Sequence, residues 1–381
     1  FALTSSHQKA RTTTDKNILR GLSECDTQIF LETLNRELDN RYFTWLESRP
    51  RTNNRNGLSS TQLKQRLRLL IENKCLSKAV DLIKRANDPS PTITIDRPLM
   101  DKLQELHPTK RPMDDIPLGI RTNNHLSLST EDVGLGVHNL PRHRAGGLSG
   151  WSYDLLRSLG SGSSSSEFIV LLKDLFNLFL AGRGGDPSAW TASRLFPLPK
   201  PDGGVRPIAV GEVWIRLLSR IVLKRIGDDI VKDLLPFQWA IAVKGGAEIL
   251  CHTLHLLKHI ILNCDEPALE NISNLMPKSS CIQSIDLHNA FNCISRSSIH
   301  KAIESCCPQI LAFFRWSYGN QSSLRLSNGN IIQSGAGVRQ GDPLGSLYFC
   351  LGIRESINRL HQQFSDVHIF AYADNIHLLA H

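Results

Sequence analysis

Residues 281–291 of the chain read Cys281-Ile282-Gln283-Ser284-Ile285-Asp286-Leu287-His288-Asn289-Ala290-Phe291, and residues 369–375 read Ile369-Phe370-Ala371-Tyr372-Ala373-Asp374-Asn375. Each stretch contains an apolar, β-prone run that ends near an aspartate. We therefore predict two strands that present Asp286 and Asp374 at their tips. If the two strands pair side by side, the carboxylates converge and repel each other unless a cation lies between them. Mg²⁺ suits such a site, because it prefers hard oxygen ligands and keeps several waters.

A nucleoside triphosphate that bridges two such metal ions is set up for in-line phosphoryl transfer. One metal ion activates the attacking 3′-hydroxyl and the other steadies the leaving pyrophosphate. The triphosphate also needs cations, and the turn at residues 200–206 (Lys-Pro-Asp-Gly-Gly-Val-Arg) presents Lys200 and Arg206 on either side of its glycines. Residues 337–346 (Gly-Val-Arg-Gln-Gly-Asp-Pro-Leu-Gly-Ser) form a turn before a helix, where exposed backbone amides can line a groove for template or nucleotide.

Each of these pieces is unspecific when taken singly. An aspartate at a strand end is most often a turn or helix-cap residue, and a Lys-Pro-Asp-Gly-Gly segment is usually only a turn. The functional interpretation depends on the order and spacing of all the segments together.

The surrounding pattern predicts an α+β fold with an antiparallel sheet. Strand-like runs bounded by turn pairs alternate with amphipathic helical runs. The predicted hairpins cover residues 193–210, 324–332 and 367–381, and the predicted helices cover residues 151–159, 167–181, 212–235, 247–262 and 343–360, with a further helix from about residue 296.

The segments upstream of residue 140 carry no chemical motif. Residues 1–90 are polar with apolar residues at spacings of three and four, which predicts a helical extension. This extension either packs on the rest of the chain or forms a basic nucleic-acid-binding arm. Residues 91–140 are rich in proline and charge, and we interpret them as an extended linker with short structured pieces.

The ordered motifs at residues 198–208, 284–292, 337–344 and 370–375 resemble the fingers and palm motifs of reverse transcriptases, closest to the non-LTR retrotransposon type. Residues 145–156 look like the opening fingers motif of the same family. The resemblance implies a right-hand polymerase, with fingers at residues 141–235 and a palm at residues 236–381 that stops after the last catalytic motif. We therefore expect the thumb to be absent, and we expect little or no primer extension by this chain alone.

The resemblance also implies roles for single residues. Asp286, Asp374 and Asn375 are expected to be catalytic, and Asp286, Leu287 and Asp374 to bind two Mg²⁺ ions, for which Mn²⁺ is a possible substitute. The remaining expected roles are nucleotide binding by Lys200, Arg206, Phe291, Gln340 and Gly341, and contacts to primer or template by Arg339 and Tyr372. Phe291 is expected to collide with a 2′-hydroxyl and so to favour deoxynucleotides. The implied partners are an RNA template, a DNA primer and deoxynucleoside triphosphates.

The chain departs from the family at position 375, where a second aspartate is usual and this sequence has asparagine. Asparagine keeps an oxygen ligand but loses a negative charge, so we expect weaker metal binding. This leaves a second hypothesis open, a non-catalytic relative that binds RNA or a protein partner. An RNA-dependent RNA polymerase is a third hypothesis, which Phe291 disfavours.

The bulk composition agrees with this interpretation without establishing it. The 381 residues carry a net charge of +8 and a sequence pI of about 9.1, which favours a polyanionic partner. The nine cysteines include no Cys-x-x-Cys pair, which disfavours a zinc ribbon and indicates reduced thiols in an intracellular protein. No uncharged apolar stretch reaches the roughly 18 residues of a membrane span. The resemblance alone implies action in the nucleus, and the oligomeric state stays open.

Overall fold

The structure is a computed structural model that describes residues 60–72, 95–108, 116, 124–142, 144–162, 165–200, 203–262 and 281–380. Of the helical extension predicted for residues 1–90, only α3 (Ser60–Glu72) lies within these ranges. It is helical, as predicted, and the rest of that prediction lies outside the described residues. No helix in the described ranges is both long enough and apolar enough to cross a membrane.

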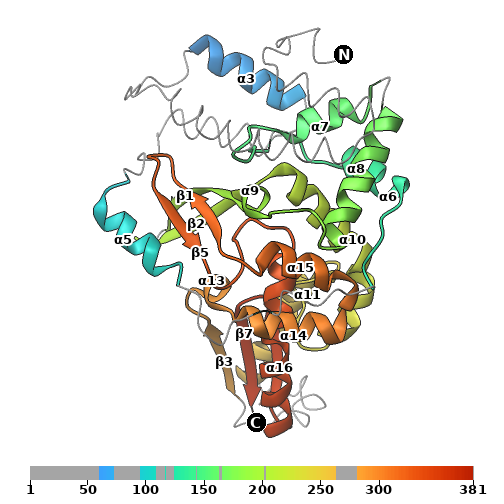
Figure 1. The fold of residues 1–381 in the computed structure, drawn as a ribbon. Helices are drawn as coiled ribbons and strands as arrows, with labels where there is room; N and C mark the ends of the chain where they lie inside the picture. The colour runs from blue at the N-terminus through green and yellow to red at the C-terminus, as the bar shows by residue number, and fades with distance from the viewer. Residues whose placement is uncertain are drawn as a thin grey trace.

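A three-stranded antiparallel sheet carries the two aspartate motifs (Figure 1). Its order is β3 (Cys281–Asp286), β7 (Asn375–Ala380) and β6 (His368–Tyr372). The strand that leads into Asp374 therefore does not pair with the Asp286 strand, which corrects the pairing expected above. The returning strand β7 lies between them, because β6 and β7 form a tight hairpin and β7 offers its free edge to β3.

A second sheet joins the two other predicted hairpins in the order β2-β1-β4-β5. Its strands are β1 (Ser193–Pro199), β2 (Val205–Gly211), β4 (Ser322–Arg325) and β5 (Ile331–Ser334). Both hairpins are confirmed. A short parallel pairing of β1 with β4 links them, although well over a hundred residues separate the two strands in the chain.

Helices surround the sheets and supply the main core. The longest are α8 (Ser165–Leu180), α10 (Val213–Leu234), α11 (Gly246–Leu262) and α16 (Gly345–Gln363). The shorter ones are α7 (Tyr153–Leu159), α9 (Ser188–Thr191), α13 (Ala290–Cys293), α14 (Arg296–Cys306), the 3₁₀ turn η4 (Pro308–Ile310) and α15 (Leu311–Tyr318). Large aromatic side chains that are almost fully buried, such as Phe176 and Trp214, fill the space between these helices.

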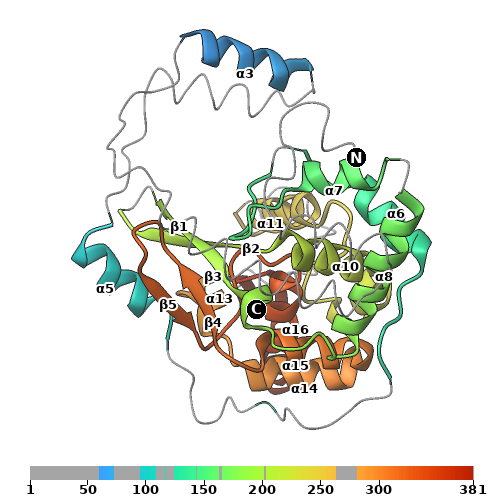
Figure 2. The ribbon, with the colours of Figure 1, turned by 45° about the horizontal axis from the view of Figure 1, so that its top comes forward.

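The region interpreted as an extended linker with short structured pieces, residues 91–140, includes two short helices. These are α5 (Arg97–Glu105) and α6 (Thr130–His138), and both contribute buried side chains to hydrophobic clusters. Proline does not prevent the first of them, because Pro98 lies in the first turn of α5, where its missing N–H is not needed. Leu103 of α5 is fully buried against the second sheet, and Figures 1 and 2 show the helix beside those strands.

Candidate active site

Asp286 and Asn375 face each other across the paired strands β3 and β7. Directly opposed residues in an antiparallel pair share one face of the sheet, with Cβ atoms about 5 Å apart. Asp374 is the last residue of the turn that leads into Asn375, and Tyr372 pairs with Asn375 from the other side. The sheet thus brings the predicted catalytic residues to one end, where Asp286 and Asn375 are exposed and Asp374 is half-buried.

The turn that carries Asp374 is held by Gln238, a residue that the sequence analysis missed. Ala373 has a positive φ of 54°, which costs a residue with a side chain roughly 1 kcal/mol or more. The buried Gln238 side chain offsets this cost, because its Oε1 accepts from the Ala373 backbone N–H at 2.7 Å and its Nε2 donates to the Ala373 carbonyl at 3.3 Å. The only signal in the sequence is a glutamine within an apolar run.

The loop that contains Gln340 packs against the segment after Asp286. The Val338 backbone N–H donates to the Phe291 carbonyl at 2.7 Å. Gly337 has a φ of 59°, and a Cβ there would come within 2.4 Å of that same carbonyl oxygen, so only glycine allows this approach. The Phe291 ring stacks on Phe349 of α16, with ring centroids 4.7 Å apart. Phe291 is therefore fixed close to the Gln340 loop.

Side-chain amides continue this connection to α5. Gln340 Nε2 donates to Asn292 Oδ1 at 3.5 Å, and Asn292 Nδ2 donates to Asn289 Oδ1 at 2.9 Å. Asn289 Nδ2 in turn donates to the Leu106 carbonyl at the end of α5, at 2.9 Å. These four groups form an amide relay, in which a helix far upstream in the chain braces the predicted nucleotide site.

The comparisons with known proteins agree with this geometry. Residues 198–381 match the family described as reverse transcriptase (RNA-dependent DNA polymerase). The chain is 28% identical over 263 residues to the retrotransposable element SLACS 132 kDa protein of Trypanosoma brucei gambiense, a match that covers 67% of the chain and 20% of that protein. It is 27% identical over 226 residues to the retrovirus-related Pol polyprotein from type-1 retrotransposable element R2 of Nasonia vitripennis, covering 55% of the chain and 20% of the relative.

Residues 198–381 belong to the reverse transcriptase family. The SLACS and R2 relatives place this reverse transcriptase domain with the non-LTR retrotransposons. The chain spans about a fifth of the length of these two relatives.

The cationic residues of the first hairpin lie at the exposed end of the reverse transcriptase domain's second sheet. Lys200 and Arg206 are both exposed, and the Lys200 backbone N–H closes the turn by donating to the Gly204 carbonyl at 2.8 Å. Further along β2, the Ala209 N–H donates to the Gln340 carbonyl at 2.7 Å. One strand thus connects the predicted triphosphate-binding hairpin to the Gln340–Gly341 loop.

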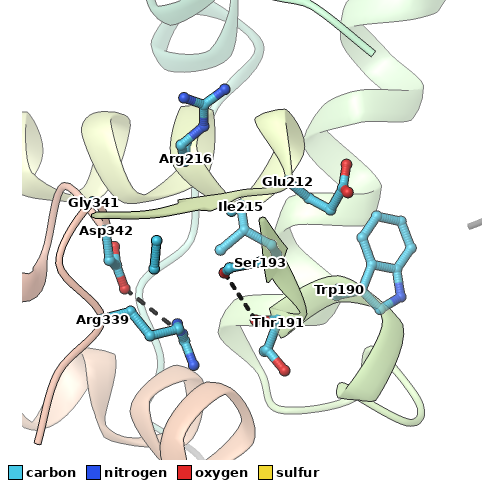
Figure 3. Close-up of a pocket in the computed structure, with 11 residues that line it drawn as sticks. Trp190, Thr191, Ser193, Glu212, Ile215, Arg216, Arg339, Gly341 and Asp342 are labelled. Carbon is cyan, nitrogen blue, oxygen red and sulfur yellow. Dashed lines mark hydrogen bonds and ion pairs between the residues drawn. The ribbon is translucent and has the colours of Figure 1, made fainter. Parts of the chain in front are cut away.

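Arg339 does not lie where the sequence analysis expected a primer or template contact. Its side chain is only 4% exposed, and its Nη1 donates to the Ser317 carbonyl at 3.0 Å. The guanidinium lies 3.9 Å from the Tyr318 ring centroid and 3.8 Å from Asp342 Oδ2, an ion pair drawn in Figure 3. Arg339 is therefore enclosed by its own loop and by α15, and it stabilises the Gln340 loop from within.

Glu212 is a buried acid that fixes the segment around Ser149, which the sequence analysis likened to an opening fingers motif. It is fully buried, accepts from the Ser149 backbone N–H at 2.9 Å through Oε1, and accepts from the Ser149 hydroxyl at 2.5 Å through Oε2. Burial raises the pKa of the Glu212 carboxyl, and the Ser149 hydrogen bonds partly offset that rise. Glu212 also lines a cavity of about 20 Å³, large enough for one water, which lies between the hairpin strands and the Gln340 loop (Figure 3).

The predicted metal ligands are carboxylate and amide oxygens. Within the described ranges, no three His, Cys, Asp or Glu side chains gather in a way that could hold a metal ion. The acidic groups predicted as ligands are Asp286 and Asp374, with the Asn375 amide beside them, while Leu287 follows Asp286 and packs partly into the core. Hard oxygen donors of this kind fit Mg²⁺, although with less charge than a site with three carboxylates.

Proposed function

We propose that this chain is part of a retrotransposon reverse transcriptase that carries out RNA-templated DNA synthesis by two-metal nucleotidyl transfer in the nucleus, and that the chain alone has little or no activity. The observation that carries the proposal is the pairing of Asp286 with Asn375, next to Asp374, at one end of the three-stranded sheet. Membership of residues 198–381 in a family of RNA-directed DNA polymerases supports it.

In this mechanism Asp286, Asp374 and Asn375 would hold the divalent cations, with Leu287 at the edge of the site. When bound, Mg²⁺, or Mn²⁺ in its place, would activate the primer 3′-hydroxyl and stabilise negative charge on the leaving pyrophosphate. Tyr372, which is exposed beside Asn375, packs against the end of the primer.

The nucleotide is oriented by residues of the β1–β2 hairpin, of α13 and of the Gln340 loop. Lys200 and Arg206 neutralise the triphosphate, with Arg206 suited to bidentate contacts. Phe291, immobilised by its stacking on Phe349, excludes a 2′-hydroxyl and so selects deoxynucleotides. Gln340 and Gly341 contact the incoming nucleotide and the template base.

Replacing Asp286 by Asn tests the proposal. This change removes one ligand charge at nearly constant volume, and we expect at least tenfold weaker Mn²⁺ binding by the 381-residue chain, about 1.4 kcal/mol, as followed by electron paramagnetic resonance. Any extension of a DNA primer on an RNA template should be lost as well. Asp366→Asn, an equal charge change in the exposed turn before β6, is the matched control and should bind Mn²⁺ like the wild type. Wild-type Mn²⁺ affinity in Asp286→Asn would contradict the proposal.

The asparagine at position 375 favours a second candidate function, a non-catalytic reverse transcriptase relative that binds RNA or a protein partner. Asn375→Asp places a carboxylate opposite Asp286 and should tighten Mn²⁺ binding and raise primer extension several-fold if the site is only weakened. Extension is measured on a DNA primer annealed to an RNA template, and Mn²⁺ binding by electron paramagnetic resonance. RNA binding without nucleotide incorporation by either form would support the second candidate.

A further inference from the structure

A buried arginine, Arg296, binds the backbone that leads from β5 into the Gln340 loop. It is the first residue of α14 and is only 2% exposed. Its Nε donates to the Gly337 carbonyl at 2.9 Å, and its Nη2 donates to the carbonyls of Ser334 and Ala336 at 3.1 and 3.4 Å. One guanidinium therefore fixes most of the backbone between the strand and the loop.

The same guanidinium also binds the end of α15. Its Nη1 donates to the carbonyls of Tyr318 and Asn320 at 2.9 and 3.2 Å, and its Cζ lies 5.2 Å from the Tyr318 ring centroid. Each of the three guanidinium nitrogens thus donates to at least one backbone carbonyl. Lysine would keep the charge, but it has three donors and no planar fork, so it could not replace this set of contacts.

The turn that joins Phe291 to Arg296 contacts this backbone at two places. Arg296 binds it at residues 334–337, and the Phe291 carbonyl accepts from the Val338 N–H at 2.7 Å. Phe291 and Arg296 are only five residues apart in the chain, so the turn between them is short. A displacement of the bound backbone would therefore change the space between the Phe291 ring and the Gln340 loop.

We propose that Arg296 is a positioning residue for sugar selection. By binding residues 334–337 it holds the Gln340 loop against the segment that carries Phe291, and it keeps the space beside the Phe291 ring too small for a 2′-hydroxyl. Because Arg296 is buried, it acts through this backbone and does not touch the nucleotide. The inference rests on the proposed function, since Phe291 selects deoxynucleotides only in that mechanism.

Nucleotide binding by the 381-residue chain tests the inference, with dUTP and UTP as probes because they differ only in the 2′-hydroxyl. Equilibrium dialysis is carried out with Mn²⁺ and an RNA template annealed to a DNA primer that ends in a dideoxynucleotide, so that no incorporation occurs. The wild type should bind UTP more weakly than dUTP. In Arg296→Lys the ratio of the UTP Kd to the dUTP Kd should fall several-fold, whereas a general loss of stability would weaken the binding of both nucleotides alike.

The control is Arg157→Lys, the same change at another arginine that binds backbone carbonyls. Arg157 of α7 donates from Nη1 to the carbonyls of His138 and Leu140, at 2.6 and 2.8 Å, and its loss should leave the Kd ratio unchanged. Ser334→Ala is a milder second variant, because it removes only the hydroxyl that lies 3.3 Å from Arg296 Nη2. It should lower the ratio by a smaller factor. Circular dichroism melts verify that each variant folds.

Hydrogen exchange followed by mass spectrometry supplies a readout that needs no nucleotide. The amides of residues 336–341 should exchange faster in Arg296→Lys than in the wild type or in Arg157→Lys, because the loop opens more often. Wild-type exchange, or faster exchange with a wild-type Kd ratio, would overturn the inference alone, and Ser334→Ala decides if Arg296→Lys does not fold. A wild-type chain that binds UTP as tightly as dUTP, or binds neither, would instead contradict the role of Phe291 in the proposed function, and the inference with it.

Discussion

Asn289 shows how one side chain connects the reverse transcriptase domain to a helix far upstream in the chain. Its backbone is left-handed, with a φ of 52°, and its amide is bound on both sides, by the Leu106 carbonyl and by Asn292. Asparagine is one of the few residues that adopt this conformation readily. The backbone and the side chain of Asn289 therefore serve different purposes, and two substitutions separate them.

Asn289→Gly keeps the left-handed backbone and removes only the amide, whereas Asn289→Ala also adds backbone strain of about 1 kcal/mol. Because the relay ends at Gln340, we expect both variants to raise the Kd of the 381-residue chain for the deoxynucleotide in the presence of Mn²⁺. Denaturant unfolding should show Asn289→Ala to be the less stable of the two. A wild-type Kd in Asn289→Gly would show that the relay does not support the nucleotide site.

The sequence identified those site residues whose positions are set by the strands and turns immediately next to them in the chain. Asp286, Asp374 and Asn375 follow strand-like runs, and the pairing of the strands does bring them to one end of a sheet. The sequence did not predict the supporting roles of Gln238 and Asn289 or the burial of the Arg339 side chain. The contacts of these residues join segments more than twenty residues apart. No pattern within a short window carries that information.

Among elements, the β6–β7 hairpin depends most on support from outside itself. Its turn contains the strained Ala373, and residues 237–239 run alongside β6, where the Ala371 N–H donates to the Phe237 carbonyl at 2.7 Å. The hairpin itself was predictable from its alternating pattern and tight turn. Its support was not, since the pairing partner lies more than a hundred residues upstream.

Gln238→Ala should loosen this hairpin. The change leaves the Ala373 N–H without its acceptor, and we expect a loss of about 1–3 kcal/mol in the free energy of unfolding together with weaker Mn²⁺ binding at the adjacent Asp374. Gln238→Glu keeps the acceptor for the Ala373 N–H but loses the donor to its carbonyl, so it should recover part of the Mn²⁺ affinity. Equal Mn²⁺ affinity in all three proteins would mean that the clamp does not position Asp374.

The elements whose positions the sequence did not predict are those defined by packing between distant segments. Helices α5 and α6 are each nine residues long and lie in a proline-rich region, so their local signal is weak. They become evident only through Leu103 against the second sheet and through Val133 and Val137 in the main core. The parallel β1–β4 contact is likewise set by the whole fold and not by either hairpin alone.

For the whole molecule, the dependence of stability on pH includes opposing contributions from buried groups. Burial raises the pKa of Glu212, so this carboxyl stabilises the fold at low pH, and its contribution is lost as pH rises through the folded-state pKa. Burial lowers the pKa of His107 and of His300, so these imidazoles stabilise the fold at high pH. Their contribution is lost as pH falls below the unfolded value of about 6.5.

His300 allows a direct test, because its ring Nε2 accepts a hydrogen bond from Arg315 Nε at 2.9 Å and protonation would abolish it. The neighbouring Arg315 adds to the effect of burial on the pKa of His300, and Glu304 opposes it. In His300→Gln the amide oxygen can still accept from Arg315 but does not titrate.

Urea unfolding from pH 8 to pH 5 should therefore show the free energy of unfolding falling less steeply with decreasing pH in His300→Gln than in the wild type. The two slopes should differ by at most about 1.4 kcal/mol per pH unit, the limit for one proton. The exposed His138→Gln serves as the control and should follow the wild type, since Glu212 and His107 are common to all three proteins. Parallel curves for His300→Gln and the wild type would show that the His300–Arg315 contact contributes nothing to the acid sensitivity of the fold.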